Sequence, residues 1–174
     1  AFFPSNVFGV PDPRATVTAP SVDPREICSI GLGGELVIGF KDQVVVNGPG
    51  VDVVVYENAF IYGNDRLYAE PARVELSRNG VDWVRVPFDS ATLEGCIGVT
   101  PTTGMDPFDP TVSGGDGIDL EGLNIDSVKY IKLVDVSEII LNNSDHMYYD
   151  PTLSGADIDA VVGINTAVKP TETT

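Results

Sequence analysis

Residues 72–86 read ARVELSRNGVDWVRV, and this stretch decides the fold class. Apolar and polar side chains alternate with a period of two in residues 72–77, as in a strand that buries one face. Asn79 and Gly80 follow, and this pair supplies the positive φ angles that a tight hairpin turn requires. Residues 82–86 then form the returning strand. The stretch therefore predicts a β-hairpin.

Further strands are expected at short intervals along the chain. Residues 35–40 place Leu36, Ile38 and Phe40 on one face, and residues 52–56 form a β-branched run typical of a central strand. Two more strands are expected at residues 128–134 and 158–164. Gly, Pro and Asp turns separate the strands, and no helical pattern of about 10–15 residues alternates with them. The pattern predicts an all-β sandwich with long Asp/Gly-rich loops and little helix.

The 174 residues show no internal repeat or composition break, so the whole chain, 1–174, is predicted to be a single β-sandwich domain. Residues 1–26 contain five prolines and no clear periodicity, which predicts an extended N-terminal segment. Residues 157–162 read either as a short helix or as a strand. The polar residues 169–174 are expected to form a frayed tail or to lead toward a removed anchor.

The charge balance excludes two classes of partner. Ten Lys and Arg against twenty-six Asp and Glu give a formal net charge of −16 and a pI near 4.1. This sign is wrong for phosphates and for anionic lipid, so neither nucleic acid nor a membrane surface is expected as the main partner. No stretch has the apolar length for direct membrane insertion. The start Ala1-Phe2-Phe3 fits a mature chain after signal cleavage, and a trimmed chain equally. With the acidic composition, it favours an extracellular, cell-surface or periplasmic location.

Cys28 and Cys96 are the only two cysteines, and they show no metal-binding spacing. In an oxidising compartment they are expected to form one disulfide, which would stabilise the fold by about 4 kcal/mol in the chain-entropy model. The alternative is two separate buried thiols.

Acidic and amide side chains gather where strands give way to loops. Hard oxygen ligands from irregular backbone are those that Ca²⁺ prefers. Because Asp, Asn and Gly are also good turn formers, the alternative is a solvated acidic surface. No named motif decides between them, since residues 116–122 do not have EF-hand spacing and residues 114–119 match only the start of a β-roll repeat. The candidate metal ligands are Glu57, Asn58, Glu70, Asp116, Asp119, Asp157 and Asp159.

Catalytic patterns are weak. His146 is the only histidine and no GxSxG motif is present, so no catalytic residues are predicted. A carboxylate-dependent glycosidase built on Glu57 and Glu70 is the low-probability exception. Exposed aromatic side chains suggest a sugar platform instead, whereas Trp83 is expected in the core. The candidate ligand-contact residues are Tyr62, Tyr68, Tyr148 and Tyr149.

Several short segments, in order over residues 29–165, resemble a family of secreted bacterial β-sandwich proteins described as cell-surface or exported proteins, some with C-terminal sorting anchors. The matching segments are Leu32-Gly33-Gly34 with the strand to Phe40, residues 46–52 leading into Tyr56-Glu57-Asn58-Ala59-Phe60, Ala69-Glu70-Pro71, Gly80-Val81-Asp82-Trp83, Gly114-Gly115-Asp116 with Asp119-Leu120, and residues 157–161.

The resemblance implies a jelly-roll-like sandwich that is exported, binds calcium and has no established catalytic activity. Its acidic motif positions are the candidate ligands named above together with Asp52. The polar loop at residues 59–64 departs from the family pattern and would reshape a pocket there. No anchor is visible in the sequence, so two alternatives stay open: the protein acts alone, or it is a subunit of a larger assembly.

The sequence thus predicts a secreted, calcium-stabilised β-sandwich that serves as a binding or structural module on the cell surface or in an extracellular assembly. Its partners would be other surface proteins or glycan. A glycan-binding module is the alternative function, and a glycosidase is a distant third.

Overall fold

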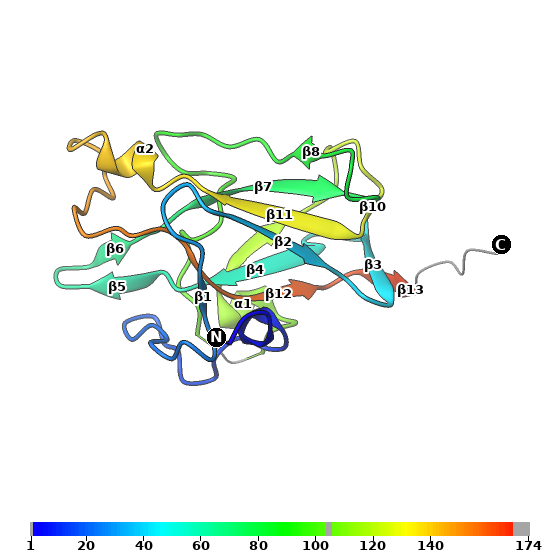
Figure 1. Ribbon diagram of the computed structural model, residues 1–174, viewed down its shortest axis with the longest axis horizontal. Helices are drawn as coiled ribbons and strands as arrows, with labels where there is room; N and C mark the ends of the chain where they lie inside the picture. Colours follow the sequence, from blue (N-terminus) through cyan, green and yellow to red (C-terminus); the bar gives the residue numbers. More distant parts are fainter. Residues whose placement is uncertain (1, 104–105, 169–174) are drawn as a thin grey trace.

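The computed structural model of the protein describes residues 2–103 and 106–168. Within these residues every paired strand is antiparallel, and helix is confined to the short segments η1 (Ser5–Val7), α1 (Pro110–Ser113) and α2 (Glu138–Leu141) (Figure 1). The all-β prediction is confirmed. No helix in the described part of the chain has the length and hydropathy to cross a membrane. The expected tail at residues 169–174 lies outside the described residues.

Two four-stranded sheets carry most of the fold, and two smaller sheets complete it. The first sheet has the order β1 (Cys28–Ser29), β12 (Asp157–Gly163), β4 (Val53–Glu57), β9 (Asp116–Ile118). The second has the order β2 (Glu35–Gly39), β11 (Tyr130–Asp135), β7 (Ala72–Ser77), β8 (Val84–Arg85). The smaller sheets are β10 (Ser127–Val128), β3 (Gln43–Val46), β13 (Thr166–Val168), and the hairpin of β5 (Phe60–Tyr62) with β6 (Arg66–Tyr68).

The two large sheets bury one common core. Alternate residues of β2, β11 and β7 point inward, and they share a cluster with residues of β4 and β12. The members from the second sheet include Leu36, Ile38, Ile131, Leu133, Val74 and Leu76, and those from the first include Val53, Val55 and Ile158. The period-two alternation read from the sequence is therefore the pattern that fills this core.

Strand β4 is buried on both faces. Its other face packs Val54 and Tyr56 against Ala160 and Val162 of β12. The Tyr56 hydroxyl donates to the carbonyl oxygen of Pro107 at 2.8 Å, which ties the loop before α1 to the sheet. A continuous β-branched run suits such a strand, as the sequence predicted for residues 52–56.

A third cluster lies at the end of the molecule that carries α2 and the β5–β6 hairpin (Figure 1). Leu93, Cys96, Ile140 and Leu153 form its buried centre. Since these residues come from loops and a single helical turn, neither strand nor helix periodicity marks them in the sequence.

The predicted hairpin is confirmed, but its tight turn is wrong. Strands β7 and β8 pair through Glu75 with Arg85 and Leu76 with Val84, and residues 78–83 form a longer loop between them. Only Gly80 takes a positive φ there, of 76°. The Asn79 side-chain oxygen accepts the backbone N–H groups of residues 81 and 82, each at 2.9 Å, and closes the loop instead.

Two other expectations are resolved. Residues 157–162 lie in strand β12 rather than in a helix. The N-terminal segment contains the turn η1 and an isolated bridge between Thr16 and Ala19, and it buries Val7 and Ala15. The N-terminal segment therefore packs against the rest of the protein.

Candidate functional site

Four acidic side chains meet near one end of the first sheet, and we call them the acidic cluster: Glu57, Glu70, Asp116 and Asp157. Glu57 ends β4, while Asp116 and Asp157 begin the two strands that flank it. Glu70 follows the β5–β6 hairpin. Glu57, Glu70 and Asp116 are 1%, 5% and 8% exposed, and Asp157 is half-buried.

Backbone N–H groups hold the two glutamates. Glu57 Oε1 accepts the N–H of Asp157 at 3.0 Å. Glu70 Oε1 accepts the N–H of Gly155 at 2.9 Å, and also the N–H of Ser154. The second oxygen of Glu57, Oε2, is buried without a hydrogen-bond partner among the described residues. A buried polar atom with no partner is costly, so this oxygen requires an explanation.

The turn at Gly98 holds Asp116. Asp116 Oδ2 accepts the N–H of Gly98 at 2.7 Å and that of Val99 at 3.1 Å. Gly98 has a φ of 82°, and a Cβ at this position would lie 2.5 Å from the Glu70 carbonyl oxygen and 3.3 Å from the Glu57 carboxyl carbon. Only glycine fits here, which brings the turn against the cluster.

Among residues 2–103 and 106–168, no positive side chain forms an ion pair with the acidic cluster. Burial raises the pKa of Glu57 well above its ordinary value, and the charges of Glu70, Asp157 and Asp116 raise this pKa further. Burial also raises the pKa values of the other three members. The cluster is therefore unfavourable in its fully ionised form.

A cleft of about 270 Å³ reaches the cluster from outside. Asp116 and Asp119 line it together with Thr100. Of the four cluster members, Asp116 alone lines this cleft, so the cleft meets the cluster at Asp116.

The carboxylates do not converge on one point. Within residues 2–103 and 106–168, no three Asp, Glu, His or Cys side chains have the arrangement of a metal centre. All the oxygens around the cluster are hard donors, and one of them is orphaned. In its chemistry this donor set suits Ca²⁺, with at most two carboxylates bound to the ion and the other ligands drawn from main-chain carbonyls and water.

Three predicted metal ligands lie outside the acidic cluster. Asn58 accepts the N–H of Ser21 at 2.7 Å and donates to its carbonyl oxygen at 2.8 Å, so it anchors the N-terminal segment. Asp119 is exposed and accepts the N–H of Glu121 at 2.8 Å. Asp159 is buried and binds the N-terminal segment.

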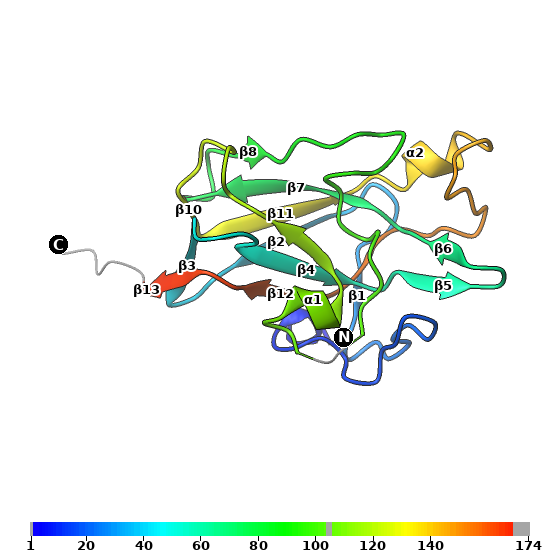
Figure 2. The ribbon, with the colours of Figure 1, turned by 180° about the vertical axis from the view of Figure 1, so that it is seen from behind.

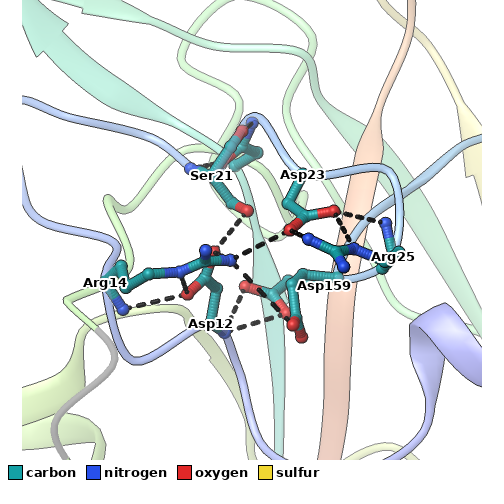
Figure 3. Close-up of polar contacts among 8 residues, drawn as sticks. Asp12, Arg14, Ser21, Asp23, Arg25 and Asp159 are labelled. Carbon is teal, nitrogen blue, oxygen red and sulfur yellow. Dashed lines mark hydrogen bonds and ion pairs between the residues drawn. The ribbon is translucent and has the colours of Figure 1, made fainter.

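Figure 3 shows the hydrogen bonds between Asp159 and the N-terminal segment. The N–H of Asp12 donates to both Asp159 oxygens, at 2.9 and 3.2 Å. The Asp12 carboxylate accepts Arg14 Nε at 2.8 Å and the Ser21 hydroxyl at 2.7 Å, and its hydrogen bond to Arg14 lowers its pKa to about 2. Burial raises the pKa of Asp159 to about 7, and the charges of Asp12 and Glu26 add to the effect.

This anchor was not predicted from the sequence, although the sequence contains a signal for it. Asp12-Pro13-Arg14 recurs as Asp23-Pro24-Arg25. In both copies the aspartate accepts the N–H and the guanidinium of the arginine two residues later. The repeated tripeptide marks two side-chain-closed turns within the segment that was predicted to be merely extended.

Asp52 holds a different part of the fold. It is fully buried, and its Oδ1 accepts the N–H of Gly48 at 2.7 Å and Asn165 Nδ2 at 2.8 Å. Its Oδ2 accepts the N–H of Leu120 at 2.8 Å. This one carboxylate therefore joins three segments that are far apart in the sequence.

The predicted ligand-contact tyrosines gather at the end that carries the third cluster. Tyr68 stacks on Phe60 with ring centroids 5.1 Å apart, and Tyr62 lies edge-on to Tyr68 at 6.1 Å. Tyr148 and Tyr149 pack against the third cluster.

The hydroxyls of the two hairpin tyrosines donate hydrogen bonds to the loop at residues 150–152, which follows α2. The Tyr62 hydroxyl donates to Asp150 at 2.7 Å, and the Tyr68 hydroxyl donates to the carbonyl oxygen of Thr152 at 3.1 Å. These contacts fasten the β5–β6 hairpin to the loop.

The structure contains no disulfide between Cys28 and Cys96, which are both free thiols in it. Cys28 packs against the common core, whereas Cys96 is buried in the third cluster, so they belong to different packing regions. Burial raises the pKa of both thiols, to about 12 for Cys96.

We expect two titratable thiols per chain, of which Cys96 reacts at least about tenfold more slowly with iodoacetamide because the thiolate is the reactive form. Mass spectrometry of peptides from timed alkylation of the native protein measures both rates, with the unfolded protein as control. A native mass two protons short of the reduced mass would contradict the free-thiol state.

No family model, curated protein or solved structure matches the chain. The fold and the site define the class of protein directly: an antiparallel all-β protein with a buried, uncompensated carboxylate cluster at strand ends.

Proposed function

We propose that this protein is a secreted, calcium-stabilised, jelly-roll-like β-sandwich that works as a binding or structural module on the cell surface or in an extracellular assembly. The observation that carries the proposal is the acidic cluster: four neighbouring acids that form no ion pair with any described residue, and a buried Glu57 oxygen without a hydrogen-bond partner there. Its partners would be other surface proteins or glycan.

A divalent cation removes the physical difficulty of the cluster. Buried carboxylates repel one another and lose hydration, and a bound ion compensates both costs. Ca²⁺ accepts six to eight oxygens in loose geometry, including main-chain carbonyls. The cleft at Asp116 supplies the route by which the ion would enter.

An enzymatic role has less support. Glu57 and Glu70, the pair considered for glycoside hydrolysis, are buried and hydrogen-bonded to backbone N–H groups. A general acid or nucleophile must instead reach a bound sugar. The proposal therefore keeps the protein as a non-enzymatic module.

Calcium should raise the melting temperature. An ion that binds only the folded chain stabilises it by about 2.7 kcal/mol at one hundred times its dissociation constant. For a chain of this size that corresponds to a rise of about 5–10 °C. Differential scanning calorimetry at pH 7.5 in EGTA, in Ca²⁺ and in Mg²⁺ measures the effect, and Mg²⁺ should be less effective.

Two matched variants locate the effect. Asp116→Asn should weaken the response to Ca²⁺, whereas Asp42→Asn, at an exposed acid between β2 and β3, should leave it unchanged. Equal melting in EGTA and Ca²⁺, together with no calcium in the purified protein by elemental analysis, would reject the proposal.

A further inference from the structure

A second, larger cleft shares no residue with the acidic cluster. Its volume is about 940 Å³, at the upper end of the range of about 300–1,000 Å³ for small-molecule sites. The β7–β8 loop forms one side with Arg78, Asn79 and Asp82. Asn47, which follows β3, and Asn124 and Asp126, which precede β10, form the other side. Strands β3, β8 and β10 lie at the same end of the molecule (Figure 2).

The cleft combines polar sides with an aliphatic floor. Val84, Leu120 and Ile125 line it, and all three are also packed into the common core. Leu120 is 1% exposed and Ile125 is 9% exposed, so the floor is a fixed part of the core rather than a mobile surface.

Hydrogen bonds hold the sides in place. Asn79 Nδ2 donates to Asp82 Oδ2 at 2.9 Å, while its oxygen closes the loop as described above. Asp52 fixes the opposite side, since it binds the N–H of Gly48, next to Asn47, and the N–H of Leu120. The polar groups are therefore presented by a rigid frame, which reduces the entropy lost on binding.

The charges exclude several ligands. The single cation, Arg78, already pairs with Asp126 at 3.2 Å, and Asp82 adds a further negative charge. Phosphate, sulfate and uronic acid groups would therefore be repelled. A lipid or another largely apolar ligand would desolvate three amides and two carboxylates and offer them no new hydrogen bonds.

We propose that this cleft binds a neutral sugar. Amide and carboxylate side chains together donate to and accept from adjacent hydroxyl groups, and the aliphatic floor suits the C–H face of a sugar ring. The proposal goes beyond the calcium role and places glycan recognition away from the predicted tyrosines.

A printed array of neutral, sulfated and uronic-acid glycans provides the probes, and isothermal titration then uses the best neutral glycan in EGTA and in Ca²⁺. We expect binding of neutral glycans only, and in both solutions. The double variant N47A/D126N should weaken it at least tenfold with unchanged melting, whereas N64A/D42N, which alters an exposed amide and an exposed acid elsewhere, should not.

Asn124→Gly gives a second test, because it removes an amide where φ is 54° without straining the backbone. Asn124→Gly should weaken binding of the neutral glycan. It therefore still tests the cleft if the double variant N47A/D126N folds poorly. Absence of any neutral-glycan binding, preference for anionic glycans, or loss with Tyr62→Ala but not with the cleft variants would overturn the proposal. Binding that persists in EGTA separates this result from the calcium test.

Discussion

Asp52→Ala is expected to lower the free energy of unfolding by about 3–5 kcal/mol, the typical loss when one partner of a buried polar network is removed. The substitution removes the shared acceptor of three donors: the buried N–H of Leu120, and the partly buried N–H of Gly48 and side-chain amide of Asn165. Each unpaired donor costs about 1–3 kcal/mol. The small cavity left by the carboxylate adds to this loss.

Urea unfolding followed by circular dichroism measures the change. Asp52→Asn keeps the shape and one acceptor oxygen, so its loss should be intermediate. Asp119→Ala serves as the matched control, since it removes an exposed acid that accepts the N–H of Glu121, two residues later. A loss below about 1 kcal/mol for Asp52→Ala would show that the three segments hold together without this carboxylate.

The strands could be predicted because their evidence is local. Residues 35–40 and 72–77 alternate with a period of two, and the structure places them in β2 and β7 with their apolar faces in the common core. The turn after β7 could not be predicted from Asn79 and Gly80 alone. The asparagine uses its side chain to close a longer loop, and that choice depends on where the ladder of β7 and β8 stops.

The acidic cluster was only partly predictable. Position at a strand end singled out Glu57, Glu70, Asp116 and Asp157, and the structure brings them together because strands that pair in a sheet bring their ends together. It could not separate them from Asp159, whose partner is the N-terminal segment. The partners of a buried carboxylate are set by segments distant in the sequence, and those segments carry no periodic signal.

The raised pKa values of the acidic cluster should contribute stability to the calcium-free protein in acid, and this contribution should be lost as pH rises. Asp159, which lies outside the cluster, illustrates the sign, since its pKa is about 7 in the folded chain against an ordinary 3.8. Between these values the folded chain binds more protons than the unfolded one, so stability falls as pH rises. This contribution is complete below pH 3.8 and is lost as pH rises through about 7. Glu57 acts in the same direction, and its pKa is raised well above 4.5.

Glu57→Gln should therefore stabilise the protein in EGTA at pH 8, by roughly 2 kcal/mol or more. A group with an ordinary pKa of 4.5 costs up to about 5 kcal/mol if it keeps its proton at pH 8, because each pKa unit corresponds to about 1.4 kcal/mol. If Glu57 ionises instead, its folded form carries the free-energy cost of burying a charge and of repulsion from the neighbouring carboxylates. Glutamine avoids both costs and keeps the oxygen that accepts the N–H of Asp157.

In saturating Ca²⁺ the order should reverse, since the wild-type carboxylate then has a cation and the amide is a weaker ligand. Urea unfolding at pH 5, 6.5 and 8, with and without Ca²⁺, gives the two pH profiles, and the exposed Glu94→Gln is the control for loss of one negative charge. Stabilisation in EGTA without reversal in Ca²⁺ would mean that the cluster stores repulsion but does not use calcium to relieve it. Destabilisation in EGTA at pH 8 would mean that Glu57 is compensated in the folded chain by an interaction other than a cation.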